Sequence, residues 1–211
     1  MSDDLAARLI VMDTGPLITL AAADTLDYLL YPGVPVHIPD AVLYEARRDG
    51  AALGAAEILD WAQRNSEQVR SISTEAFFNY VQARENNPAH RERDLGERAA
   101  IEAIHDAVHL AADERALLIT EDDRVLRRVL VLEAELTARM IPITTRDFLE
   151  GMEAAQRINS ADEVYRRAED AGRLASRRAA LADQHARARA AVDRLLRPSA
   201  SAPDDTPQGQ G

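Results

Sequence analysis

The chain has 211 residues with a formal net charge of −11, and 46% of its residues are hydrophobic, enough for one domain with a real core plus an appendage. It contains no cysteine and no lysine, which excludes disulfides, thiolate metal sites, Walker A phosphate binding and Schiff-base chemistry. No apolar run approaches the roughly 20 residues that cross a bilayer, and the acidic start is unlike a signal peptide, so we expect a cytoplasmic protein without membrane contact.

Strands and helices are predicted to alternate along the first 150 residues. Apolar runs of strand length lie at 8–12, 34–38, 69–73, 116–120 and 140–143. Helical patterns lie between and after them, at 14–30, from 39, at 52–64, from 74, at 95–112 and at 123–138. Strands separated by such helices predict an α/β fold with a central parallel sheet. Pro142 predicts that the last strand lies at an edge.

The character of the chain changes beyond residue 150. Ser160 and Glu163 have the spacing of a capping box, which predicts a long helix running from there to about Arg197. The last residues are rich in Pro, Ser, Gly and Gln, which is typical of a disordered tail. We therefore divide the chain into a domain at 1–150, a helical extension at 151–197 and a tail at 198–211.

Four acidic residues are predicted to stand where a strand or turn gives way to a helix, namely Asp13, Glu45, Glu97 and Asp122. A fold that gathers carboxylates from distant segments at one end of a sheet builds a site for a hard divalent cation and a phosphate. The pattern favours a metal-dependent phosphodiesterase. The alternative is structural: aspartate is also a favoured helix N-cap, and a glutamate within a helix is commonly only solvated.

In chain order, the segments 13–18, 38–45, 96–101 and 118–123 resemble the motifs of the PIN-domain family. The resemblance covers about residues 8–147 and is similar to the toxin ribonucleases of bacterial toxin–antitoxin pairs and to their relatives with a Gly-Glu third motif. It implies a PIN-like three-layer sandwich and an Mg²⁺- or Mn²⁺-dependent endoribonuclease acting on RNA. It also implies a homodimer and a cognate antitoxin that holds the enzyme inactive.

The resemblance assigns the acids in chain order. Asp13, Glu45 and Asp122 match the first, second and fourth family acids. For the third acid, Glu97 matches the Gly-Glu form, while Asp94 suits the form in which an aspartate opens this helix. The structural alternative for Asp94 is a helix N-cap. Asp123 is a candidate alternate ligand. These residues are expected to hold the metal ion.

Other residues are expected to support this chemistry. Thr120 is placed to hydrogen-bond a ligating carboxylate. Substrate contact would have to come from arginines, and the candidates beside the acids are Arg47, Arg48, Arg124, Arg127 and Arg128. Two other functional classes stay open: a non-catalytic PIN-like protein-binding or regulatory module, and a phosphohydrolase acting on other phosphate esters.

Overall fold

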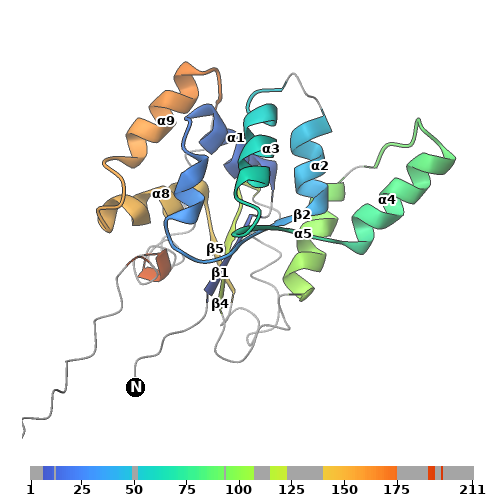
Figure 1. Ribbon diagram of the computed structural model, residues 1–211, viewed down its shortest axis with the longest axis horizontal. Helices are drawn as coiled ribbons and strands as arrows, with labels where there is room; N and C mark the ends of the chain where they lie inside the picture. Colours follow the sequence, from blue (N-terminus) through green and yellow to red (C-terminus); the bar gives the residue numbers. More distant parts are fainter. Residues whose placement is uncertain are drawn as a thin grey trace, which may run out of the picture.

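A five-stranded parallel sheet forms the centre of the protein, seen in a computed structural model (Figure 1). The structure describes residues 7–11, 13–48, 52–92, 94–106, 115–122, 140–174, 190–192 and 196. The strands are β1 (Ala7–Val11), β2 (Val36–Pro39), β3 (Val69–Ile72), β4 (Arg115–Ile119) and β5 (Met140–Ile143). Their order is β3-β2-β1-β4-β5, so β5 with Pro142 is an edge strand, as predicted.

Helices follow the strands and flank the sheet. They are α1 (Thr14–Ala22), the 3-10 helix η1 (Leu26–Leu30), α2 (Asp40–Arg48), α3 (Ala55–Arg64), α4 (Glu75–Asn86), α5 (Leu95–Asp106), α8 (Thr145–Ala154) and α9 (Ala161–Asp170). The predicted first helix is therefore divided, because the chain turns at Asp24, which has a φ of 56°, before η1 begins. The predicted helix at 123–138 lies outside the described residues.

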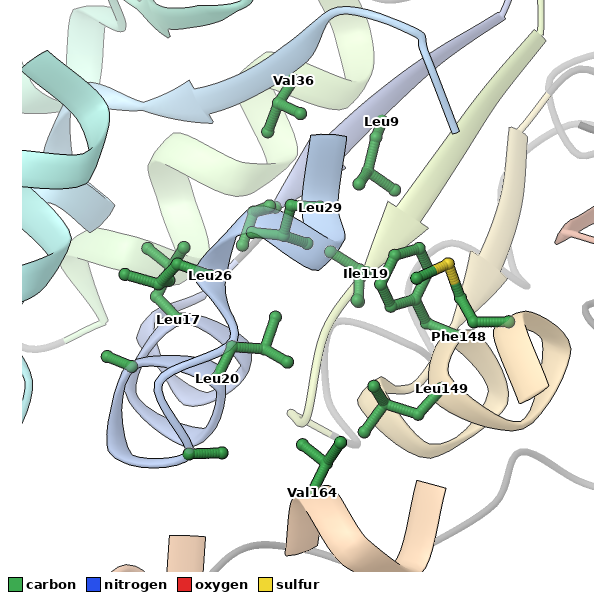
Figure 2. Packing of buried hydrophobic residues seen from close by; sticks show 14 of the residues in the cluster. Leu9, Leu17, Leu20, Leu26, Leu29, Val36, Ile119, Phe148, Leu149 and Val164 are labelled. Atoms are coloured by element: carbon green, nitrogen blue, oxygen red, sulfur yellow. The ribbon is translucent and has the colours of Figure 1, made fainter. Parts of the chain in front are cut away.

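The main core lies on one face of the sheet. Leu9 of β1 and Ile119 of β4 pack there with the apolar side of α1, including Leu17 and Leu20 (Figure 2). Phe148, Leu149 and Val164, from α8 and α9, join the same cluster. Side chains alternate along a strand, so Ile10 and Leu118 point to the opposite face, and both are fully buried as well. Burial on both faces is what a parallel sheet flanked by helices requires.

A second, smaller cluster joins three helices beside the sheet. Tyr80 of α4 packs there with small and apolar residues of α2 and α5. Its hydroxyl lies 3.2 Å from that of Tyr44 on α2, and Arg84 donates to both hydroxyls. Asp40, at the start of α2, accepts hydrogen bonds from the backbone and side chain of Thr74 at 3.0 and 2.7 Å. These contacts fix α2 against α4, which projects beyond α2 in Figure 1.

The described residues after 150 pack on the sheet domain, although the helix that follows Ser160 is shorter than predicted. Ser160 caps α9 by accepting from the backbone of Glu163, as predicted, but α9 ends at Asp170 rather than near Arg197. The physical reason is Gly172, whose φ of 91° is left-handed and ends the helix. Farther along, Val192 is buried in the main core beside Gly151 of α8. None of the described helices is long and apolar enough to cross a membrane.

Candidate active site

Asp13 stands just after β1 and is held by a dense set of hydrogen bonds. As the N-cap of α1 it accepts from the backbone N–H of Gly15 at 2.7 Å through Oδ1. Its Oδ2 accepts from the hydroxyl of Thr120 and from the backbone N–H groups of Glu121 at 2.8 Å and Asp122 at 3.3 Å. β1 and β4 are neighbouring parallel strands, so the turn after β4 folds over the carboxylate that follows β1. Asp13 therefore both caps α1 and lies at the carboxyl end of the sheet.

The hydrogen bonds do not fully compensate Asp13 for its loss of water. Burial raises the pKa of Asp13 above the ordinary 3.8, although the donors from Thr120 and from the backbone after it act in the opposite direction. A carboxylate that is oriented by several donors and still disfavoured as an anion is one that a cation would stabilise.

Glu45 reaches the same region from α2. Burial raises its pKa above the ordinary 4.5, and the negative charge of Asp13 raises it further. A hydrogen bond from the backbone N–H of Gly96 and the positive charge of Arg48 act in the opposite direction. The charge of Asp13 therefore acts on Glu45, although the two residues are 32 positions apart in the sequence.

Two glycines allow the carboxylates to approach the backbone. A Cβ atom on Gly15 would lie 2.7 Å from Oε2 of Glu121 and 2.8 Å from Oδ1 of Asp13. A Cβ atom on Gly96, in the first turn of α5, would lie 2.8 Å from Oε2 of Glu45. Real Cβ atoms essentially never make such contacts, so a side chain at either position would displace the carboxylate that it faces.

Glu121 belongs to this site as well, which the sequence reasoning missed. Its Oε1 accepts from the hydroxyls of Thr19 at 3.1 Å and Thr145 at 2.7 Å, and its Oε2 accepts from Arg173 at 3.3 Å. Burial raises the pKa of Glu121, Thr145 lowers it through its hydrogen bond, and the charge of Asp13 raises it. The site thus contains a third carboxylate, packed against buried threonines.

Comparison with known families decides which fold family carries this site. A family model described as a PIN domain matches residues 9–168, which is most of the chain. The chain belongs to the PIN-domain family. No curated protein matches the chain significantly. PIN domains are generally nucleases and typically use divalent metals, so the family agrees with a carboxylate-lined site at the carboxyl ends of the strands.

The structure describes the remaining acids that the PIN resemblance assigned only in part. Asp122 contributes its backbone N–H to Asp13 and is half-buried. Asp94 is exposed in front of α5, with a φ of 61°. The side chain of Glu97 and the whole of Asp123 lie outside the described residues. Among the side chains that the structure describes, no three of the metal-ligating types are arranged to hold an ion.

The structure also describes only some of the arginines that the sequence offered for substrate contact. Arg47 and Arg48 are exposed at the end of α2, beside Glu45. Arg124, Arg127 and Arg128 lie outside the described residues. Among the described arginines, Arg173, more than 50 residues beyond β4, donates to Glu121 of the acidic site.

Proposed function

We propose that this PIN domain is a metal-dependent endoribonuclease that hydrolyses RNA phosphodiester bonds. The observation that carries the proposal is that Asp13 and Glu45, two carboxylates from different elements, are both desolvated by burial and that the charge of Asp13 acts on Glu45. Folding opposes this arrangement unless another interaction offsets it, and a divalent cation bound to both carboxylates would do so.

The residues proposed to hold Mg²⁺ or Mn²⁺ are Asp13, Glu45, Glu97 and Asp122, with Asp94 as the alternative third acid and Asp123 as the alternate ligand. Carboxylate oxygens are the ligands that these hard cations prefer. When bound, the ion supplies activation of a water molecule and stabilisation of charge on the phosphate. The chain's own contribution is orientation, because Thr120 and the backbone of Glu121 and Asp122 fix Oδ2 of Asp13.

The test is a calorimetric titration of the purified protein with Mn²⁺ and with Mg²⁺, followed by cleavage of total RNA in the same samples. We expect the wild type to bind the ion and to cleave RNA, and Asp13→Asn to lose both while remaining folded. Asp60→Asn is the matched control, because Asp60 is an exposed acid on α3 that pairs with Arg64.

The outcomes separate the other functional classes. Ion binding by the wild type without cleavage of RNA would favour a non-catalytic protein-binding or regulatory module. Turnover of a small phosphomonoester in place of RNA would favour a phosphohydrolase of other esters. Failure of the wild type to bind either ion would contradict the proposed metal site.

The proposal extends to the setting in which the enzyme acts. We propose a cytoplasmic homodimer that serves as the toxin of a toxin–antitoxin pair, with a cognate antitoxin protein as its inhibitor. Induced expression of the wild type should then stop growth, and expression of Asp13→Asn should not. Sedimentation of the purified protein tests the dimer.

A further inference from the structure

Arg173, three residues after the end of α9, has a fixed backbone position. The N–H of Gly172 donates to the carbonyl of Glu169 at 2.8 Å, and the N–H of Arg173 donates to that of Ala168 at 2.9 Å. With the left-handed φ of Gly172, these two bonds form a Schellman motif. α9 packs against α1 through its buried face, which includes Ala168, so the end of α9 is anchored to the helix that Asp13 caps.

The side chain of Arg173 extends from this anchor to the candidate active site. Its Nη2 donates to Oε2 of Glu121 at 3.3 Å, and its Nε donates to the hydroxyl of Thr19 at 3.4 Å. The Glu121 side chain is 9% exposed, whereas that of Arg173 is 26% exposed. The guanidinium therefore covers a buried carboxylate while part of it stays open to solvent.

These contacts are loose for an arginine whose only role is an ion pair. Arg166 donates to both oxygens of Glu163, at 3.0 and 2.6 Å, and Arg146 donates to Glu150 at 2.6 Å. Charge-assisted hydrogen bonds are commonly about 2.7–2.9 Å long, and an arginine has five N–H donors. In the part of the chain that the structure describes, the Arg173 side chain donates only the two long hydrogen bonds. It retains donors for another oxygen anion.

We propose that Arg173 binds a backbone phosphate of the RNA substrate at the edge of the acidic site. This inference rests on the proposed function. A polyanion approaching Asp13, Glu45 and Glu121 meets negative charge, and a fixed guanidinium beside them offsets that repulsion. Its planar fork matches two phosphate oxygens, a geometry that an ammonium group does not offer. Arg173 lies beyond the residues matched by the family model, so it is a substrate-binding residue supplied by this chain's own C-terminal segment.

The experiment measures binding of a fluorescein-labelled, mixed-sequence RNA by anisotropy, with Ca²⁺ in place of the catalytic ion, over a series of salt concentrations. Arg173→Gln is expected to weaken binding about tenfold and to reduce the slope of log affinity against log salt by about 1, the value for one lost phosphate contact. Arg173→Lys should recover only part of the affinity. Arg166→Gln removes the same charge from an exposed ion pair on α9 and should change neither quantity.

A second variant separates phosphate binding from a purely structural ion pair. Glu121→Gln removes the negative charge that competes for Arg173, so RNA binding should be retained or strengthened, and Arg173→Gln should still weaken it in that background. Equal RNA affinity and salt slope in the wild type and Arg173→Gln would overturn the proposal, as would wild-type protein that binds no RNA. Cleavage by the wild type decides the proposed function independently. An active ribonuclease whose RNA binding does not depend on Arg173 refutes only this inference.

Discussion

Asp13 and Glu45 face the same site but are held in different ways. Asp13 receives four hydrogen bonds, three of them from backbone N–H groups, and is fixed by the turn after β4. Glu45 receives one backbone hydrogen bond, from Gly96, and otherwise depends on the nearby charge of Arg48. The Asp13 carboxylate links the start of α1 to the turn after β4, whereas the Glu45 side chain extends from α2 across to α5. The first should tolerate change badly in both stability and activity, and the second mainly in activity.

Removing the Asp13 carboxylate should have the largest effect. Asp13→Ala leaves the hydroxyl of Thr120 and the N–H groups of Gly15, Glu121 and Asp122 without their acceptor, and it removes the cap of α1. We expect a loss of roughly 2–4 kcal/mol in the free energy of unfolding together with loss of cleavage. Urea denaturation of Asp13→Ala, Asp13→Asn and the wild type measures the free energy of unfolding. A loss below about 1 kcal/mol in Asp13→Ala would contradict the structural role of Asp13 in linking α1 to the turn after β4.

Gly96→Ala should separate activity from stability on the Glu45 side. The new Cβ would lie 2.8 Å from Oε2 of Glu45, and that oxygen is the far end of a flexible side chain, so Glu45 can move away. Alanine also favours the helix by about 1 kcal/mol over glycine. We expect RNA cleavage to fall at least about tenfold, in proportion to the lost positioning, while the melting temperature stays equal or rises.

Gly15→Ala is the matched comparison for that prediction. Its Cβ would press on Asp13 and Glu121 at once, and it would lie 3.0 Å from the Cβ of Glu121, which cannot swing aside. We expect this variant to lose stability as well as cleavage. Equal melting temperatures for the two alanine variants would mean that both sides of the site adapt equally well. That result would contradict the proposed difference between Asp13 and Glu45.

Thr120→Val should produce a smaller effect. The substitution keeps the shape of the side chain but removes the hydroxyl that donates to Oδ2 of Asp13 and accepts from the N–H of Asp122. Mutation of a residue that orients a metal ligand typically lowers metal affinity about 10–100-fold. We expect the lower end because three backbone donors to Asp13 remain. Mn²⁺ titration measures the change, and Thr120→Ser, which keeps the hydroxyl, should bind the ion like the wild type.

The sequence predicted the part of the site that follows local rules. A strand-length apolar run ending in Asp13, and a similar run ending at Thr120, place both residues at the carboxyl ends of parallel strands, where they meet. The α/β class and the edge position of β5 were predicted on the same basis and are confirmed. The family, which the resemblance of the four motifs indicated, is confirmed as well. The assignment of the four acids as metal ligands stays a prediction.

Glu121 was missed because its partners lie far away in the chain and show no common pattern. It is 102 residues from Thr19 and 52 from Arg173, and threonine and arginine are unremarkable at those positions. The early end of α9 was, by contrast, readable: a glycine at 172 after an apolar-periodic helix is a C-terminal signal. The long run of alanine and arginine beyond it favoured helix and concealed that signal.

Glu45→Gln should give the smallest effect on stability, and the pH dependence of that effect tests how the charge of Glu45 is held. A pKa raised by folding means that ionisation of Glu45 opposes folding; this penalty is absent below the ordinary pKa of 4.5 and complete above the raised value. Removing the charge should therefore raise the melting temperature of the metal-free protein at neutral pH, and the gain should shrink as the pH falls and vanish below 4.5. Each kcal/mol gained corresponds to about 2–4 °C in a protein of this size.

Scanning calorimetry with a chelator present at several pH values measures that gain, and the same scans with Mn²⁺ complete the test. A bound ion stabilises the folded state by mass action, so Mn²⁺ should raise the melting temperature of the wild type more than that of Glu45→Gln. The difference in melting temperature between the two proteins should therefore shrink or change sign. A gain that is independent of pH would show that Glu45 is not destabilised as an anion. In that case Glu45 would not be a desolvated anion that a cation stabilises, and the result would contradict its role in the proposed metal site.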